Sequence, residues 1–347
     1  MTAHDPLLEV SAVSVQYRRG RSILSALSDV SFTVGAGESV GLVGESGSGK
    51  STIARAVLGL APLHSGVIKF SGGDVTHLRF KQRRDLYREI QMVFQDPYSS
   101  LNPARTVGGT LAEPLEAIGH FSKAEVRSRV YASLERVALP TEAASRYPQE
   151  FSGGQRQRIA IARALILAPR LVICDEAVSA LDLSVQAQIL NLLQDLQVES
   201  GLSYLFISHD LEVVQYLCER VVVLYKGQVM ETGPVHEVTS NPAHPYTAAL
   251  HEASPLPDPR AQRARQIARE AVPSEDTSVG GGATPAACPF APRCPHVRPR
   301  CRTERPQLRR AERDALVACH QYPEWREEVR PAKSSSAEEE KHLADAS

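Results

Sequence analysis

The fold of this chain is decided by the stretch Gly44-Glu45-Ser46-Gly47-Ser48-Gly49-Lys50-Ser51, which Thr52 follows directly. Its spacing, G-x-x-x-x-G-K-[ST], is that of a phosphate loop, in which a tight glycine turn aims several backbone N–H groups at a polyphosphate. Apolar residues 39–43 predict a strand before the loop, and residues 50–60 predict a helix after it, whose N-terminal dipole favours an anion. We expect Lys50 to reach the β- and γ-phosphates and the Ser51 hydroxyl to bind Mg²⁺. The motif therefore predicts a site for a nucleoside triphosphate.

Two carboxylates end a second apolar run, Leu171-Val172-Ile173-Cys174-Asp175-Glu176. A run of this kind predicts a strand that is buried on both faces. We expect Asp175 to hold Mg²⁺, directly or through water, and Glu176 to polarise the attacking water as a general base. In isolation the run is equally compatible with a strand that ends in solvated acids. The complete phosphate loop upstream favours the catalytic interpretation.

The composition fits one large folded domain with a smaller one beside it. The chain has 347 residues, 42% of them apolar, and its 39 Lys and Arg residues nearly balance its 40 Asp and Glu residues. The resulting net charge of -1 implies no general surface for nucleic acid. The N-terminus lacks the pattern of a secretion signal, and no run of about 18 apolar residues occurs. We expect a protein of the cytosol or of the periphery of a membrane.

Strands that alternate with helices predict an α/β core with a largely parallel sheet. Residues 13–17 alternate between apolar and polar, as in a half-buried strand, and residues 107–139 have helical periodicity. Ser184 is expected to cap a further helix, and residues 221–231 predict a hairpin.

Shifts in composition divide the chain into four parts. Apolar periodicity predicts a nucleotide-binding domain at 7–255, and prolines with a triple glycine predict a linker at 256–286. A Cys-rich C-terminal domain is placed at 287–325. The polar and charged residues 326–347 are expected to form a disordered tail.

Six cysteines fall into two groups. Two lie in apolar surroundings and are expected to be buried: Cys174 and Cys218. The other four lie within a short C-terminal segment: Cys288, Cys294, Cys301 and Cys319. Four thiolates fit either a tetrahedral Zn²⁺ or a [4Fe–4S] cluster. The absence of paired C-x-x-C spacing favours the cluster, while zinc, or thiols that are free or form disulfides, remain alternatives. Nearby arginines are expected to offset thiolate charge: Arg293, Arg298, Arg300 and Arg302.

A third motif, Phe151-Ser152-Gly153-Gly154-Gln155, stands about a hundred residues after the phosphate loop. With it, residues 7–255 resemble the nucleotide-binding subunits of ABC transporters. The resemblance implies a P-loop NTPase cassette with an N-terminal antiparallel β-subdomain and a helical signature subdomain. It also implies that Ser152, Gly153, Gly154 and Gln155 complete the ATP site of an opposite subunit in a head-to-tail dimer, with two ATP molecules between the subunits.

The same resemblance assigns further roles. Gln95 matches the glutamine that touches Mg²⁺ or water, and His209 matches the histidine that contacts the γ-phosphate. Asp182 ends a loop that crosses the dimer interface. Tyr17 matches the aromatic that stacks on adenine, although packing at a strand end is an equal alternative. Ala177 replaces the proline common after the catalytic glutamate; no catalytic group is missing, so the resemblance implies ATP hydrolysis.

Two segments, residues 95–103 and 241–247, together with the C-terminal extension, look like the peptide and nickel importer branch of that family. This resemblance implies the ATPase subunit of a dipeptide or oligopeptide importer. Its partners would be two membrane permeases, a second ATP-binding subunit (a copy or a paralogue) and an external substrate-binding protein. Such a subunit lies at the cytoplasmic face of the inner membrane. Some members of the branch are similar in the Cys segment and carry a [4Fe–4S] cluster.

Two other functions remain alternatives. One is an ATPase subunit for import of nickel or another solute. The other is a soluble ABC protein that acts as a mechanical switch in translation or DNA repair. The single cassette, the short stretch between Gln95 and Ser152 and the nearly neutral charge all disfavour the second alternative.

Overall fold

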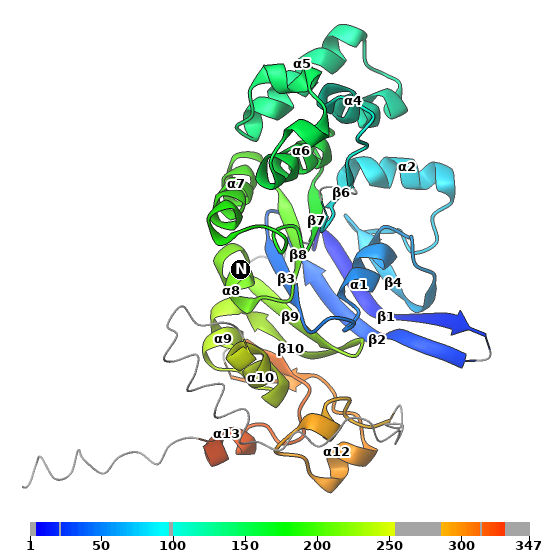
Figure 1. Cartoon of the computed structure of the whole chain (residues 1–347). Coiled ribbons are helices and arrows are strands. Elements are labelled where there is room, and N and C mark those ends of the chain that lie inside the picture. The colour runs from blue at the N-terminus through cyan, green and yellow to red at the C-terminus, as the bar shows by residue number, and fades with distance from the viewer. Residues whose placement is uncertain (1–4, 21, 97–99, 254–285, 313, 330–347) are drawn as a thin grey trace, which may run out of the picture.

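The structure, a computed structural model, describes residues 5–20, 22–96, 100–253, 286–312 and 314–329. The described strands form two sheets, one of four strands and one of eight. Helices pack on both faces of the larger sheet (Figure 1). The expected α/β cassette is therefore confirmed.

The smaller sheet is antiparallel and has the strand order β2-β1-β4-β5. Leu8, Val10, Val13 and Val15 of β1 are buried, as expected for a half-buried strand. Val10 and Val13 are three residues apart because the register shifts between them, which keeps both side chains on the core face. The expected N-terminal antiparallel subdomain consists of β1 (Leu8–Arg19), β2 (Ser22–Val34), β4 (Leu63–Phe70) and β5 (Gly73–Asp74).

The larger sheet has the strand order β11-β12-β10-β9-β3-β8-β7-β6. Five neighbouring strands are parallel, so their carboxyl ends share one edge of the sheet, where ligands of open α/β sheets bind. They are β3 (Ser39–Val43), β6 (Ile90–Val93), β7 (Leu171–Asp175), β8 (Ser203–Ser208) and β9 (Arg220–Tyr225). The predicted hairpin is confirmed, because β10 (Gln228–Pro234) pairs antiparallel with β9.

Burial on both faces explains the uninterrupted apolar runs of the central strands. Leu171 and Ile173 pack into one apolar cluster, which includes the N-terminal sheet. Val172 and Cys174 pack into the other cluster, which includes the helices of the opposite face. Each face of the strand therefore needs apolar residues, as expected for a parallel sheet.

The helix expected at 50–60 is α1 (Lys50–Val57), and the helical periodicity of 107–139 corresponds to two helices, α4 (Val107–Ile118) and α5 (Lys123–Arg136). Figure 1 shows α4 and α5 gathered at one end of the molecule, away from the C-terminal residues. The helices are α1 (Lys50–Val57), α2 (Phe80–Glu89), α4 (Val107–Ile118), α5 (Lys123–Arg136), α6 (Gly153–Leu165), α7 (Leu183–Ser200), α8 (Leu211–Leu217), α9 (Val235–Ser240), α10 (Pro245–Ala253), α12 (Pro299–Thr303) and α13 (Glu324–Val329). Short 3₁₀ turns are η1 (Thr141–Ser145), η2 (Pro148–Glu150) and η3 (Ala291–Arg293).

The N-terminus of α7 differs from the expectation. Asp182, not Ser184, is the N-cap, since its carboxylate accepts a hydrogen bond from the Val185 N–H at 2.9 Å. The Ser184 hydroxyl donates to the same carboxylate at 2.8 Å. An N-cap residue needs extended backbone dihedrals, and Asp182 has them. The helix therefore begins at Leu183, two residues earlier than a Ser184 cap would place it.

The C-terminal residues extend the larger sheet. Strand β12 (Leu316–Val317) pairs with β10, and β11 (Arg309–Arg310) pairs with β12 at the sheet edge. Trp325 anchors this segment, because its indole N–H donates to the Ala243 carbonyl at 2.9 Å. Cys288 and Phe290 join the larger apolar cluster of the cassette. The segment is therefore packed onto the cassette.

The structure describes only some of the residues at the expected linker and tail boundaries. Almost all of the expected linker, 256–286, lies outside the described residues. Helix α13 ends at Val329, so residues 326–329 are helical, where we expected the tail to begin. The reason is that Trp325 and its neighbours are tied to the core. The remainder of that expected tail, 330–347, also lies outside the described residues.

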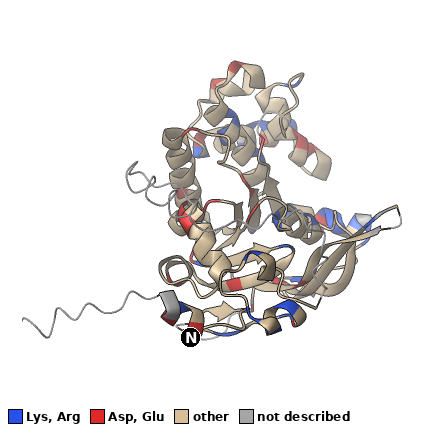
Figure 2. Ribbon diagram, turned by 60° about the horizontal axis from the view of Figure 1, so that its bottom comes forward, with Lys and Arg blue, Asp and Glu red and all other residues tan. Residues whose placement is uncertain are grey.

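Basic and acidic residues are both scattered over the described parts of the ribbon (Figure 2). Among the described residues, no helix is both long enough and apolar enough to span a bilayer.

Candidate ATP site

The phosphate loop connects β3 to α1 and turns through three glycines. Gly44, Gly47 and Gly49 have φ angles of 153°, 78° and 106°, which side chains rarely allow. A Cβ on Gly44 would lie 2.1 Å from the Leu224 carbonyl oxygen, and one on Gly49 would lie 2.9 Å from the Ala26 carbonyl oxygen. Only glycine fits both positions, and the loop that results can direct its N–H groups at a phosphate.

Lys50 is buried at the first position of α1. Its ammonium group donates to the carbonyl oxygens of Gly44 at 2.6 Å and Glu45 at 3.0 Å. Burial lowers the pKa of Lys50, and the charges of Glu176, Asp175 and Glu45 oppose this effect. A bound phosphate would offer this cation an anionic partner in place of neutral carbonyls.

Ser51 and Asp175 are adjacent, as expected for two oxygen ligands of one Mg²⁺. The Ser51 hydroxyl donates to Asp175 Oδ1 at 3.2 Å. Burial raises the pKa of Asp175, the bond from Ser51 lowers it, and the neighbouring Glu176 raises it further. A hydroxyl and a carboxylate at the end of β7 are hard oxygen donors of the kind that Mg²⁺ prefers. These two residues therefore fit the metal.

Glu176 lies at the centre of the catalytic residues. Its φ angle is 48°, an uncommon backbone conformation outside glycine, and its N–H donates to the Ile207 carbonyl at 2.9 Å. Gln95 Nε2 donates to Glu176 Oε2 at 2.8 Å, and His209 Nδ1 lies 3.6 Å from Glu176 Oε1. The residues that follow β6, β7 and β8 therefore meet at one carboxylate.

Lys50, Ser51, Gln95 and Glu176 line a cleft of about 630 Å³. Its lining also includes Tyr17, so Tyr17 occupies a position compatible with an adenine ring. Lys226 also lines the cleft, although the sequence indicated only a hairpin turn at this position. The neighbouring Gly227 N–H donates to the Ser48 carbonyl at 2.8 Å, which places the turn beside the phosphate loop. Only the sheet order brings this turn to the site.

The signature residues do not line this cleft. Ser152 caps α6, accepting the Gln155 N–H at 3.3 Å, while the Gln155 side chain accepts the Ser152 N–H at 3.0 Å. A Cβ on Gly154 would lie 2.4 Å from Val185, because α7 crosses α6 closely there. A Cβ on Gly153 would meet a neighbour only at 3.8 Å. The N-terminus of α6 is therefore accessible, and its N–H groups can receive an anion.

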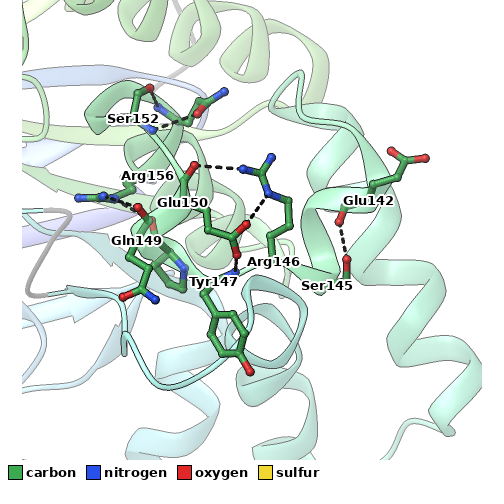
Figure 3. Close-up of polar contacts among 10 residues, drawn as sticks. Glu142, Ser145, Arg146, Tyr147, Gln149, Glu150, Ser152 and Arg156 are labelled. Atoms are coloured by element: carbon green, nitrogen blue, oxygen red, sulfur yellow. Dashed lines mark hydrogen bonds and ion pairs between the residues drawn. The ribbon is translucent and has the colours of Figure 1, made fainter.

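Polar contacts hold the segment that leads into the signature (Figure 3). The Arg146 guanidinium donates to the Glu150 carboxylate and to the Glu150 carbonyl oxygen, each at 3.1 Å. The same carboxylate accepts the Tyr147 N–H at 2.7 Å. Arg156, on the first turns of α6, donates to the Pro148 carbonyl at 2.8 Å. These bonds fix the η2 turn against the helix that carries the signature.

The C-terminal thiols lie close together, but they are not arranged as a metal site. Cys319 is within electrostatic range of the other three thiols, and burial is the main cause that raises its pKa to about 12. Burial likewise raises the pKa of Cys294 to about 11. Within the described part of the chain, no three Cys, His, Asp or Glu side chains are grouped tightly enough to hold a metal. None of the six cysteines is joined to another by a disulfide in the structure.

Two of the four arginines expected to offset thiolate charge, Arg293 and Arg300, bond to carboxylates. Arg300 forms two hydrogen bonds with Glu304, at 2.6 and 2.8 Å. Arg293 bonds to Glu45 of the phosphate loop, which no sequence pattern indicated. The guanidinium of Arg293 thus pairs with a phosphate-loop carboxylate, while its expected role in offsetting thiolate charge stays a prediction.

Comparisons with known proteins agree with this site. A family model described as ABC transporter matches residues 27–179, and one described as oligopeptide/dipeptide transporter, C-terminal region, matches residues 230–301. A Brucella ovis protein named as a peptide import ATP-binding protein is 48% identical over 314 residues, which cover 90% of this chain and 97% of that protein. A Sinorhizobium fredii protein named as a peptide ABC transporter ATP-binding protein is 47% identical over 323 residues, covering 91% and 90%.

Solved structures show the same cassette. CbiO1 of Clostridium perfringens, described as part of the ABC transporter complex cbiONQ, has a TM-score of 0.62 and 28% identity, covering 69% of this chain and 92% of its own. The dimeric ATP-binding cassette MJ0796, bound to ADP and Pi, has a TM-score of 0.60 and 31% identity, covering 66% and 98%.

The fold and the site thus define a P-loop ATPase. The chain belongs to the ATP-binding proteins of ABC transporters.

Proposed function

We propose that this chain is the ATP-hydrolysing subunit of a transporter that imports di- or oligopeptides. The observation that carries the proposal is the presence, in one chain, of the ABC transporter region and the oligopeptide/dipeptide C-terminal region. The names of the two bacterial relatives support a peptide cargo. Lys50, Gln95 and Glu176 line one cleft, and His209 lies beside Glu176, an arrangement that supports hydrolysis by this chain itself.

The proposed mechanism assigns one task to each group. The phosphate-loop N–H groups and Lys50 bind the β- and γ-phosphates, so Lys50 exchanges its present carbonyl partners for phosphate oxygens. Ser51 and Asp175 would hold Mg²⁺, which neutralises charge on the phosphates when bound. Glu176 accepts the proton of the attacking water. Gln95 and His209 both lie beside that carboxylate; Gln95 would touch Mg²⁺ or the attacking water, and His209 would contact the γ-phosphate.

A second cassette would complete the site. Ser152 to Gln155 lie at an accessible helix N-terminus and outside this chain's own cleft, so they are placed to serve the ATP of a partner. Asp182, here the N-cap of α7, belongs to the loop that we assign to the same interface. The partner is a second copy or a paralogue. ATP binding closes the pair, and hydrolysis reopens it.

We assign the complex to the cytoplasmic face of the inner membrane. Two permeases would bind the cassettes, and an external protein would deliver the peptide. The motion would pass through the segment near Gln95 and the helical subdomain of α4 and α5, which stands apart from the C-terminal residues (Figure 1). Rigid-body movement of such a subdomain is an ordinary means of coupling a nucleotide to a partner.

Uptake assays test the cargo. In cells that lack the chain, wild-type protein is expected to restore uptake of a labelled dipeptide or oligopeptide, whereas Glu176→Gln is not, because uptake needs turnover. Restored uptake of labelled nickel with no effect on peptides would replace the peptide cargo by a metal ion. A chain that stays with ribosomes or DNA after detergent washing, and not with membranes, would overturn the transporter assignment.

We further propose a [4Fe–4S] cluster on Cys288, Cys294, Cys301 and Cys319, with Zn²⁺ as the alternative. Four free thiols on one short segment, mutually within electrostatic range, have the right donor chemistry, although their loops would have to draw together to bind it. Ligation would give a segment with little core of its own a structural crosslink.

Elemental analysis tests the cluster. Protein purified without oxygen is expected to contain about four irons and four acid-labile sulfides per chain, the stoichiometry of one [4Fe–4S] cluster. Cys301→Ser should lose both, while Cys218→Ser, a buried cysteine of the cassette, should keep them. One zinc per chain without sulfide would support the Zn²⁺ site instead. Absence of both iron and zinc from freshly purified protein would contradict the proposed cluster.

A further inference from the structure

We propose that Arg293 is a positioning residue of the ATP site: it neutralises the Glu45 carboxylate and holds the phosphate loop from the C-terminal segment. The two residues are far apart in sequence. Arg293 Nη1 lies 2.8 Å from Glu45 Oε2, and Nη2 lies 3.0 Å from Glu45 Oε1. This paired geometry is the strongest form of an arginine–carboxylate contact.

Aromatic rings hold the arginine in place. Its guanidinium lies 5.8 Å from the centre of the Tyr225 ring and 5.7 Å from that of Phe290, within the range of cation–π attraction. It also donates to the Tyr225 hydroxyl at 3.4 Å. Phe290 and Tyr225 pack edge to face, with centroids 5.4 Å apart. Rings from the cassette and from the C-terminal segment therefore restrict the side chain together.

A second contact fixes the same loop residue. The Glu45 N–H donates to the Tyr246 hydroxyl at 2.9 Å, and Tyr246 packs against both Tyr225 and Phe290. Glu45 is thus held by its backbone and by its side chain. Its two partners, Tyr246 and Arg293, both follow the five parallel strands in the sequence. The conformation of the phosphate loop therefore depends on how this later part of the chain packs.

Charge explains why the contact matters for ATP. Glu45 is the second residue of the phosphate loop, and its carboxylate acts electrostatically on Lys50. Without Arg293, the negative charge of this carboxylate would be unneutralised beside the loop and would repel the incoming polyphosphate. With Arg293, the loop presents no net negative charge at this position. Loss of Arg293 should therefore lower the affinity for nucleotide. The rate at which water attacks the γ-phosphate beside Glu176 should be largely unchanged.

Nucleotide titration of the purified full-length chain tests this role. Arg293→Gln is expected to weaken binding of a fluorescent ATP analogue with Mg²⁺ about fivefold, the scale of a partly exposed ion pair, with turnover at saturation changed less than about twofold. The loss should shrink in high salt, because screening weakens the repulsion. Arg310→Gln is the matched control: Arg310 is an exposed arginine of the same segment that contacts Asp314 instead.

Removing the carboxylate separates the charge effect from folding. Glu45→Gln alone should bind the analogue more tightly than wild type, and Glu45→Gln with Arg293→Gln should return close to wild-type affinity. A double variant as weak as Arg293→Gln, or wild-type affinity in Arg293→Gln, would overturn the proposal. If Arg293→Gln does not fold, Glu45→Gln still decides, since unchanged affinity there would contradict it. None of these readouts depends on the transported cargo.

Discussion

Glu176→Gln should lower steady-state ATP hydrolysis by about a hundredfold or more, the usual contribution of a general base. The amide cannot take a proton from water, yet it keeps the size of the carboxylate and its contact with Gln95. ATP would therefore still bind and close the pair of cassettes, but the closed state would persist because hydrolysis no longer reopens it. We expect an ATP-dependent dimer that is stable during gel filtration.

Phosphate release and gel filtration with and without ATP measure this outcome. Glu199→Gln serves as the matched control, since Glu199 is exposed on α7 and lies outside the cleft. Turnover by Glu176→Gln close to that of the control would remove Glu176 from the role of base. A large loss of turnover without an ATP-dependent dimer would still support Glu176 as the general base, but it would contradict the closed dimer that we propose.

Lys50→Ala is expected to weaken nucleotide binding about tenfold to a hundredfold, as expected when a hydrogen bond to a charged group is lost. Lys50 is the buried cation beside the phosphate loop, and alanine leaves Asp175 and Glu176 without its opposing charge. Those carboxylates would then repel the γ-phosphate. The substitution acts on binding, whereas Glu176→Gln acts on turnover.

Titration with the fluorescent ATP analogue measures the loss, and thermal unfolding without nucleotide checks that the fold persists. Lys123→Ala, at the exposed start of α5, is the control for loss of one positive charge. Equal affinity in Lys50→Ala and the control would contradict the assignment of Lys50 to the phosphates.

Local sequence determined the catalytic parts of this protein. Gly44, Gly49 and Lys50 could be assigned because a phosphate loop needs those residue types at fixed neighbouring positions, and the structure requires glycine at two of them. The apolar run before Asp175 predicted a central strand because a strand that is buried on both faces has no polar side. Gln95 and His209 could be placed only through the family resemblance, since a lone glutamine or histidine carries little information.

Tertiary structure alone decided how distant segments meet. The pairing of β12 with β10 attaches the C-terminal segment to the sheet edge, and this packing brings Arg293 to Glu45. The cap of α7 at Asp182, by contrast, is a local feature, but residue type alone did not select it, because serine at 184 is an equally favoured N-cap residue. A motif such as the phosphate loop reflects what the backbone needs over a few neighbouring residues, and the spacing of residues in the sequence shows this directly. Contacts such as Arg293 with Glu45 arise from the relative placement of packed elements, which no local spacing encodes.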